Sequence, residues 1–252
     1  MFWKNWMGMF HSMSSLIIII AVMISCGGGG KEAPIETKLD SVLVDIDGNM
    51  YKVVQIGNQV WMAENLRVKH YKDGSPVAYY DDAYSWISAD HGAYCYYEND
   101  LKAADSIGAL YNWYSISDSR GLAPEGWRVP SDKDWMELEK YLGMDSSSIQ
   151  YAGYEQRGDN EATMLKTFHG WPNEITAPEY AGTNESGFSA LPSGSRSAND
   201  GSYGMIESFA YYWTATENGP NNAWSRYLGI YPDISRAYAH KTAGSSVRCI
   251  KN

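Results

Sequence analysis

Residues 123–143 read APEGWRVPSDKDWMELEKYLG, and this stretch decides the fold. Ser131 is the expected N-cap of a helix over residues 132–142, because its hydroxyl oxygen can accept a hydrogen bond from a free amide of the first turn. Acidic residues fill that turn, where they favour the positive end of the helix dipole, and Gly143 ends the helix. The apolar residues recur at helical spacing and predict one buried stripe, which consists of Trp135, Leu138, Tyr141 and Leu142.

Upstream of this helix, residues 42–63 predict a three-stranded meander. The expected strands are residues 42–46, 51–56 and 59–62, and Asp47-Gly48 and Gly57-Asn58 are the turn signals between them. The segment that begins at Asp45 resembles a calcium loop in composition, but an EF-hand loop needs Gly at position 6 and Glu at position 12. Here Gly48 is fourth and Ile56 is twelfth, so turn formation explains these residues better.

The remainder of the chain predicts an α+β domain over residues 42–252. Residues 64–104 are polar, rich in Tyr and broken by Gly and Pro, which predicts long surface loops. Helical spacing predicts a helix over residues 106–116 and a shorter one over residues 161–167. Five strands, separated by Gly, Asn and Pro, are predicted at residues 188–191, 211–216, 223–230, 234–240 and 245–250. Helices early and antiparallel strands late are typical of α+β domains.

The first 26 residues have the pattern of an export signal. Lys4 precedes an apolar run over residues 16–24, which is too short to span a bilayer because a spanning helix needs roughly 20 residues. The stretch ends in Ser25-Cys26 and resembles a signal peptide over residues 1–25 followed by a bacterial lipobox cysteine. In lipoproteins that cysteine is acylated and becomes the first residue. The alternatives are an ordinary signal peptide with a coincidental Cys26, or an uncleaved anchor.

The exported chain is expected to be tethered to the cell envelope. Residues 26–41 begin with four glycines after Cys26, which cannot hold a fold and predict a flexible tether. Palmitate-type acylation with two chains anchors a protein stably to a membrane, here expected to be the outer membrane. The whole chain has a net charge of −10, and the loss of residues 1–25, with one Lys and no acid, gives −11. No nucleic-acid partner is expected, because an acidic protein repels phosphate backbones.

Aromatic residues dominate the composition, with 20 Tyr and 10 Trp but only 5 Phe. Tyr and Trp carry a polar tip, so such rings can lie half-exposed and stack on sugars or peptides, although most are expected to fill an irregular core. The rings predicted to be exposed and to bind a ligand are Trp86, Tyr96, Tyr97 and Tyr203. Cys95 and Cys249 either form a disulfide, which an extracytoplasmic compartment permits, or remain two buried thiols.

Eight stretches taken together resemble one known family. They are DIDGNMYKVVQIGNQVWMAENLRV, YYEND, GALYNWYSI, APEGWRVPSDKDWMELEKYLG, GFSALPSGSR, YYWTATE, NAWSRYLGI and GSSVRCIKN, and they run in order across residues 45–252. This combination resembles the FISUMP domain, the major paralogous domain of Fibrobacter. The resemblance implies an exported protein or lipoprotein with no settled biochemical activity. The family pattern commonly has Cys before its PxGW motif, where this chain has Ala123, and this removes one disulfide partner for Cys249.

Two segments are more distantly similar to the formylglycine-generating enzyme superfamily. They are GWRVPS at residues 126–131, before a helix, and VRC at residues 247–249. The similarity implies a C-type-lectin-like fold with two main helices, a twisted antiparallel sheet and long loops. It does not imply the enzyme, because those enzymes use a catalytic cysteine pair that this chain lacks. Arg128 and Arg248 are expected to pair with buried acids in a structural role.

The sequence shows no motif that carries catalysis. There is no HExxH, CxxC, P-loop or GxSxG motif, and no catalytic residue is assigned. His70, His91, His169 and His240 have no second His at metal-pair spacing, so no metal or cofactor is expected. Three functions stay open. They are a surface binding module for glycan or protein partners, a structural or assembly lipoprotein of the envelope, and a formylglycine-generating-type enzyme or hydrolase.

Overall fold

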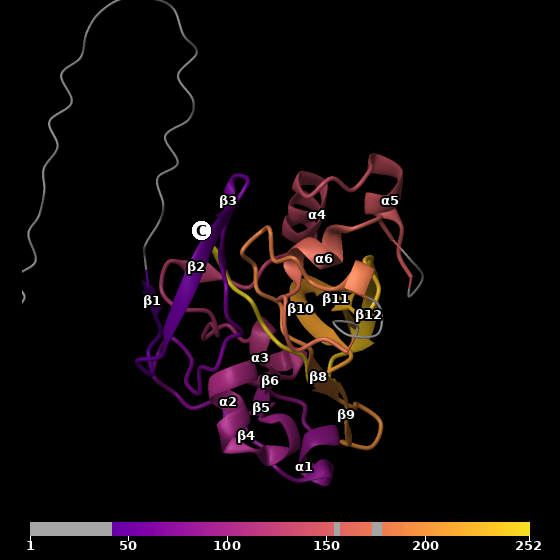
Figure 1. Cartoon of the computed structure of the whole chain (residues 1–252). Helices are drawn as coiled ribbons and strands as arrows, with labels where there is room; N and C mark the ends of the chain where they lie inside the picture. The colour runs from indigo at the N-terminus through magenta and orange to yellow at the C-terminus, as the bar shows by residue number, and fades with distance from the viewer. Residues whose placement is uncertain (1–41, 154–156, 173–177) are drawn as a thin grey trace, which may run out of the picture. The chain divides into compact units, whose positions relative to one another are not determined.

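The computed structural model describes residues 42–153, 157–172 and 178–252 (Figure 1). The predicted signal peptide, the lipidation at Cys26 and the tether over residues 26–41 lie outside the described residues. Among the residues that are described, no helix has the length and apolar character needed to cross a membrane.

The described residues form short elements joined by loops. The helices are α1 Ala83–Ile87, α2 Leu101–Ile107, α3 Trp113–Ser117, α4 Asp132–Tyr141, α5 Ser146–Gln150 and α6 Glu161–Leu165, with 3₁₀ turns η1 Tyr97–Asn99 and η2 Pro178–Tyr180. The strands are β1 Val42–Val44, β2 Met50–Ile56, β3 Gln59–Met62, β4 Ala78–Tyr79, β5 Ala93–Cys95, β6 Leu110–Tyr111, β7 Trp127–Arg128, β8 Ser193–Arg196, β9 Tyr203–Ile206, β10 Ala210–Glu217, β11 Asn222–Leu228, β12 Ile234–His240 and β13 Ile250–Lys251. The similarity to the lectin-like fold implied two main helices. Instead, one helix, α4, has ten residues and the other α-helices have five to seven.

The first sheet joins the start of the described chain to its end. Its strand order is β1-β2-β3-β13-β7, so the predicted meander is confirmed and the last strand closes it. The two hairpin turns contain Gly48 and Gly57 with φ of +81° and +60°, a backbone region in which a residue with a Cβ is strained. In the middle of the sheet, Ile250 pairs with Trp61 on one side and with Arg128 on the other.

The second sheet has the order β12-β11-β10-β8-β9 and is antiparallel except where β8 meets β10. Helices α4, α5 and α6 lie together beside β10, β11 and β12 (Figure 1). A third, small sheet has the order β4-β5-β6. The α+β class is therefore confirmed, with curled and mainly antiparallel sheets and few helices.

Helix α4 confirms the local signals of its sequence. Ser131 and Asp134 form a reciprocal capping box, in which each side chain accepts a hydrogen bond from the other residue's backbone amide. Trp135 is buried, with its ring centroid 5.2 Å from that of Trp61 and 5.6 Å from that of Phe188. Such edge-to-face pairs each contribute about 0.5–1.5 kcal/mol beyond area burial, so this aromatic cluster fixes the helix against β3 and against the chain at Phe188.

The predicted helix over residues 106–116 is wrong. Helix α2 ends at Ile107, and Gly108 has a φ of +80°, which terminates the helix. A Cβ placed on Gly108 would lie 2.7 Å from the Cβ of Asn65, so this turn also depends on close packing. The following apolar residues lie in β6 and in the separate short helix α3, so their apparent helical spacing runs across a break in the helix.

The predicted long surface loops over residues 64–104 are also wrong. This region holds β4, α1, β5, η1 and the start of α2, and Leu66, Val68 and Tyr71 within it are buried in the core. The elements are two to seven residues long, which is too short for hydrophobic periodicity to be visible.

Most of the strands predicted in the last third of the chain agree with the structure. Strands β10, β11 and β12 and helix α6 confirm the predictions within a few residues. The strand predicted at residues 188–191 is wrong, because Phe188 and Ala190 pack into the core as irregular chain and β8 begins at Ser193. The last predicted strand shortens to β13.

Candidate functional site

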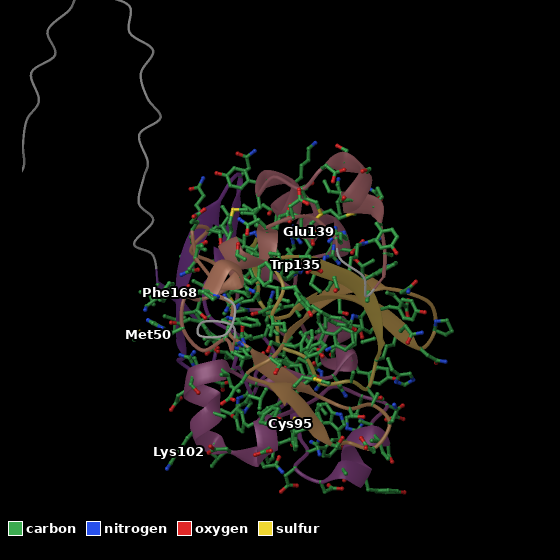
Figure 2. The ribbon with its side chains drawn as sticks, turned by 45° about the vertical axis from the view of Figure 1, so that its right-hand side comes forward. Met50, Cys95, Lys102, Trp135, Glu139 and Phe168 are labelled. Atoms are coloured by element: carbon green, nitrogen blue, oxygen red, sulfur yellow. The ribbon has the colours of Figure 1, made fainter. Side chains whose placement is uncertain are left out.

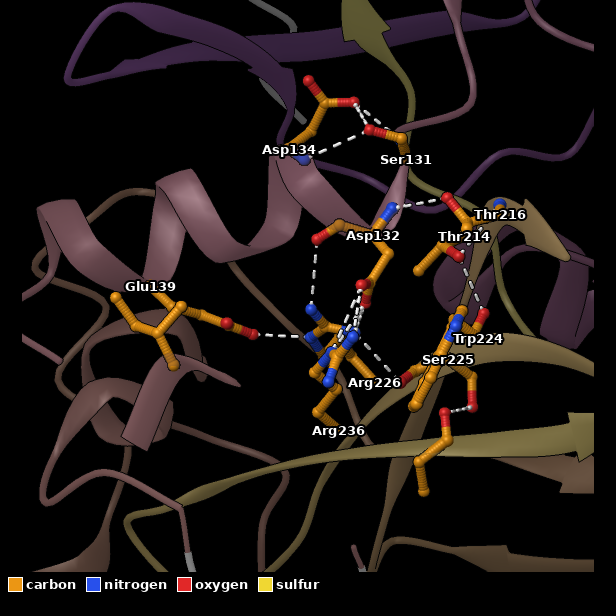
Figure 3. A network of polar contacts seen from close by, with 12 residues as sticks. Ser131, Asp132, Asp134, Glu139, Thr214, Thr216, Trp224, Ser225, Arg226 and Arg236 are labelled. Atoms are coloured by element: carbon orange, nitrogen blue, oxygen red, sulfur yellow. Dashed lines mark hydrogen bonds and ion pairs between the residues drawn. The ribbon is translucent and has the colours of Figure 1, made fainter. Parts of the chain in front are cut away.

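The buried face of α4 carries carboxylates beside its apolar rings. Asp132 and Glu139 are buried with Trp135, while Glu137 and Lys140 on the same helix are exposed. Figure 3 shows that the two buried carboxylates point toward arginines of β11 and β12. The two faces of the helix therefore place similar chemical groups in opposite environments.

Asp132 joins the helix to two strands. Its Oδ1 accepts a hydrogen bond from Arg226 Nη1 at 2.7 Å, and its Oδ2 accepts one from Arg236 Nη2 at 2.7 Å (Figure 3). Burial alone would raise the pKa of this carboxyl group, but the hydrogen bonds and charges of Arg236 and Arg226 together outweigh burial and hold the pKa below its ordinary value. The Asp132 carboxylate is therefore ionised and paired.

Glu139 extends the same network two turns further along the helix. Its Oε1 accepts a hydrogen bond from Arg226 Nε at 2.6 Å, and its Oε2 accepts one from Arg157 Nη2. Arg157 also donates to the carbonyl oxygens of Ser148 and Ile149, and its Nη1 has no partner among the described residues. Two carboxylates thus face three guanidinium groups.

This ion network is closed to solvent, because each of its side chains is at most 11 % exposed. A substrate has no access to Asp132 or Glu139, so these carboxylates do not supply an acid–base pair for hydrolysis. The network instead positions α4 by tying it to β11, β12 and the chain around α5. Long side chains that are buried and hydrogen-bonded to one another leave the helix little freedom to move.

Arg128 fixes the start of α4 from the first sheet. Its two terminal nitrogens donate to the Asp134 carboxylate at 2.5 and 2.8 Å, a bidentate geometry. Burial opposes ionisation of Asp134, but the bonds from Arg128 and Ser131 prevail and lower its pKa. The expected pairing of Arg128 with an acid is confirmed.

The exposed face of α4 borders a groove of about 530 Å³ against the β2–β3 hairpin. We call it the α4 groove, and its lining residues are Ile56, Asn58, Gln59, Glu137, Lys140 and Tyr141. Tyr141 is 64 % exposed, which contradicts its predicted place in the buried stripe. The ring is exposed because it packs against the tip of the hairpin and not against the core.

The ring of Tyr141 is fixed by close contact with Gly57. A Cβ placed on Gly57 would lie 2.7 Å from Tyr141 Cδ2, so only glycine leaves room for the ring. The Gln59 amide beside it is held at both ends, since Nε2 donates to the Asp134 carbonyl oxygen and Oε1 accepts from Trp61 Nε1, each at 3.0 Å. The α4 groove is therefore preorganised, with an aromatic ring and polar groups that face solvent.

A second concavity, of about 200 Å³, lies where several of the quoted stretches meet. Asn65, Gly108 and Ser189 line it, and Ser189 has a φ of +58°. Beneath it, the buried Arg248 donates to Asn65 Oδ1 at 2.6 Å and to the Ser189 carbonyl oxygen at 2.8 Å. Burial lowers the pKa of Arg248. Its expected pairing with an acid is wrong, because amide and carbonyl oxygens satisfy it. None of the described residues that line this pocket is aromatic.

Comparison with family models accounts for most of the chain. The model described as the Fibrobacter succinogenes major domain matches residues 54–251. The chain belongs to this family. The FISUMP resemblance is thereby confirmed, and the α4 groove and the ion network both lie within the matched residues. None of the curated proteins and none of the solved structures matches the chain.

The rings that we expected to be exposed do not form a surface in this FISUMP domain. Trp86, Tyr96 and Tyr97 are buried and Tyr203 is half-buried, so the predicted exposure is wrong for the first three. Trp86 and Tyr203 face inward toward Arg196, whose guanidinium group lies 4.7 Å from the first ring and 4.8 Å from the second. Tyr96 and Tyr97 pack against other tyrosine rings. The role of these four rings in ligand binding stays an untested prediction.

The two cysteines of the FISUMP domain are separate buried thiols. Cys95 and Cys249 are unpaired and lie in different core clusters, so the disulfide alternative is wrong. Burial raises the pKa of Cys95 to about 11 and that of Cys249 further, which keeps both thiols protonated and unreactive at neutral pH.

The acidic turn of the first hairpin behaves as turn chemistry predicts. Asp45 accepts hydrogen bonds from the amides of Asp47 and Asn49 and from the Tyr51 hydroxyl group. Asp47 in turn contacts His70 Nδ1 at 2.5 Å. Within residues 42–153, 157–172 and 178–252, no cluster of three or more His, Cys, Asp or Glu side chains is arranged to hold a metal ion.

Proposed function

We propose that this protein is a lipid-anchored envelope protein whose FISUMP domain binds a neutral oligosaccharide in the α4 groove. The observation that carries the proposal is Tyr141, an exposed ring on α4 that packs closely against Gly57. Asn58, Glu137 and Lys140 surround the ring with hydrogen-bonding groups that face solvent.

The chemistry of the α4 groove suits a sugar. The apolar face of a pyranose ring can stack on Tyr141, which offers a large contact area and loses little side-chain entropy on binding. The amide of Asn58 and the carboxylate of Glu137 can then bond ring hydroxyls, while the volume of about 530 Å³ is typical of a small-ligand site.

The negative net charge of the protein favours neutral saccharides over anionic ones. The whole chain carries a net charge of −10, and a polyanionic glycan would be repelled as it approaches. The groove itself holds one cation, Lys140, and one anion, Glu137, and so has no excess of either sign. Neutral oligosaccharides are therefore the favoured class of ligand.

An oligosaccharide array tests this proposal. The full chain, a Tyr141→Ala variant and a Tyr84→Ala variant are applied to immobilised cello- and chito-oligosaccharides. Tyr84 is the matched control, because it is 78 % exposed but lies on α1, away from the α4 groove. We expect the wild type and Tyr84→Ala to bind alike and Tyr141→Ala to bind at least tenfold more weakly, about 1.4 kcal/mol. Absence of wild-type binding, or equal binding by all three chains, would contradict the proposal.

The envelope anchor is supported by the sequence at Cys26. Residues 1–25 resemble a signal peptide, and Ser25-Cys26 resembles the end of a lipobox. The mass of the N-terminal peptide and the membrane partitioning of wild type and Cys26→Ala in a bacterial host test it. We expect acylation of Cys26 in the wild type and release of the variant into the soluble fraction. An unacylated peptide from the wild type would remove the anchor from the proposal.

We also propose a C-type-lectin-like arrangement for the fold. The support is the first sheet, in which the meander at the start of the domain pairs with β13 at its end. An experimental structure tests this, because superposition on lectin-like domains must align this sheet and α4 together. Failure of either element to superpose would leave the α+β class alone.

A further inference from the structure

The outward face of the β1–β2 hairpin is apolar. Val44 lies directly opposite Met50 across the hairpin, and Val42 lies opposite Lys52, so alternate residues share one face. Val42, Val44, Ile46 and Met50 are all more than half exposed. Met50 projects from the edge of the molecule, whereas Trp135 and Glu139 lie inside it (Figure 2).

This hairpin also ends its sheet. Strand β1 is the first in the order β1-β2-β3-β13-β7, so its outer backbone edge has no strand beside it in the described part of the chain. Edge strands of soluble proteins usually carry charges or proline that discourage pairing, and Val42-Leu43-Val44 carries neither. An exposed apolar edge of this kind is suited to contact with a partner or a surface.

Basic residues surround the apolar hairpin face. Arg67 Nη2 donates to the Met50 carbonyl oxygen at 2.8 Å, and the Lys69 amide donates to Asp47 Oδ2, which brings residues 67–72 beside the hairpin. Lys52, Lys69 and Lys72 are exposed there.

The acids in this part of the molecule are mostly engaged. Asp47 contacts His70, Asp45 is bonded within its turn, and Glu64 lies 3.7 Å from Arg67. Glu125 lines the neighbouring concavity together with Lys72. Residues 42–72 contain four Lys and Arg against three Asp and Glu, whereas the whole chain has a net charge of −10.

We propose that this hairpin face docks on an anionic phospholipid surface and so orients the domain. The inference rests on the proposed anchor, since fifteen residues, 27–41, separate Cys26 from Val42 and keep the hairpin near the bilayer. A lipid chain combined with apolar and basic contacts gives the second membrane signal that stable, oriented binding requires. A second copy of the chain fits the face less well, because a two-fold contact would bring its basic rims together.

Docking at this end presents the α4 groove to solvent. Strand β2 begins at Met50 in the hairpin face and ends at Ile56, which lines the α4 groove. Seven residues of strand separate the two sites by roughly 20 Å. The membrane contact would thus lie at one end of β2 and the oligosaccharide site at the other.

Amide hydrogen exchange on vesicles tests the docking. The full chain is mixed with phosphatidylglycerol vesicles or with phosphatidylcholine vesicles, and exchange is followed in residues 42–50. We expect at least threefold slower exchange there on phosphatidylglycerol, and recovery of the solution rate in high salt. The double variant Val44→Asn/Met50→Asn should lose the protection. Met205→Asn is the matched control, because Met205 is 56 % exposed on β9 and should change nothing.

The outcomes separate this inference from the anchor itself. The mass of the N-terminal peptide measures acylation. Amide exchange in residues 42–50 measures docking, and it can be followed in the acylated and in the unacylated chain. Equal exchange on both vesicle types, or protection that survives the double variant, would overturn the docking. Vesicle-independent protection with a dimeric mass in solution would assign the hairpin face to a second copy instead.

Discussion

The buried and the exposed face of α4 both carry charged and aromatic side chains, but these side chains have different roles. On the buried face, Asp132 and Glu139 are locked to three arginines and are closed to solvent. On the exposed face, Glu137 and Lys140 stand beside Tyr141 with no such network around them. Burial therefore decides the role of a carboxylate on this helix. A buried carboxylate is structural, whereas an exposed one can be reached by a ligand.

The buried face also explains why the exposed face can act as a site. A groove binds well when its walls are already in place, since ordering them on binding costs free energy. The ion network and the Trp61–Trp135 contact hold α4, while Gly57 and Gln59 hold the ring and the hairpin. Substitutions that disrupt one face of α4 and leave the other intact test this dependence.

The largest expected effect comes from removing one buried carboxylate. Glu139→Ala leaves Arg157 without its carboxylate partner and Arg226 with Asp132 alone in a closed interior, which should lower the free energy of unfolding by about 3–5 kcal/mol. Glu137→Ala is the matched control on the same helix and should change stability by less than about 0.5 kcal/mol. Chemical denaturation of both variants measures the difference, and comparable losses would show that the two faces are not distinct.

A smaller effect is expected from Gly57→Ala in the hairpin. The new Cβ would meet the Tyr141 ring, and the φ of +60° strains any residue other than glycine, so a loss of about 1–3 kcal/mol is expected. The displaced ring should also weaken oligosaccharide binding. Gly48→Ala is the control, because its φ is +81° but nothing lies within 4 Å of the added Cβ. Equal oligosaccharide binding by Gly57→Ala and Gly48→Ala would show that the position of the Tyr141 ring does not affect binding.

Acid should unfold the protein partly through Asp132. Its pKa is lower in the folded state than its ordinary value of 3.8, so its contribution to stability is present above that value. The contribution is lost as the pH falls through the folded-state pKa. Asp132→Asn should therefore flatten the dependence of stability on pH below about 4, while it also lowers stability at neutral pH. An unchanged acid limb in urea titrations would show that Asp132 is not a linked group.

The smallest effect is expected at the exposed pair Lys133 and Glu137, whose charged atoms lie 3.9 Å apart. Exposed pairs at i and i+4 contribute about 0.3–0.5 kcal/mol, and salt screens them. Lys133→Ala should thus change the unfolding midpoint slightly at low salt and not at high salt. A loss above about 1 kcal/mol would mean that the exposed face of α4 also has a structural role.

Sequence predicted the parts of the fold that depend on local signals. The meander needed only alternating residues and two Gly turns, and α4 needed an N-cap, acidic residues in its first turn and a periodic apolar stripe. The helix predicted at residues 106–116 failed because Gly108 packs against Asn65, which is distant in sequence. Short elements between residues 64 and 104 gave too few residues for any period to be visible.

The candidate site was less predictable because its partners are far apart along the chain. Arg226 is 87 residues from Glu139 and Arg236 is 104 residues from Asp132, and no local pattern links them. Tyr141 occupies a regular position in an apolar stripe, and the sequence of the helix therefore predicts burial. Its exposure instead follows from its contact with Gly57 in the β2–β3 hairpin. Of the rings predicted to be exposed, Trp86 and Tyr203 instead lie against the buried Arg196, a contact that no local pattern indicates.

The central claim is that the exposed face of α4 binds an oligosaccharide through Tyr141. Hydroxyl-radical footprinting of the full chain, with and without cellohexaose or chitohexaose, tests it most directly because it reports the accessibility of single side chains. The account predicts that oxidation of Tyr141 falls severalfold with one of these sugars while oxidation of Tyr84 stays constant. Unchanged oxidation of Tyr141, or protection that appears only around Asn65 and Ser189, would contradict it.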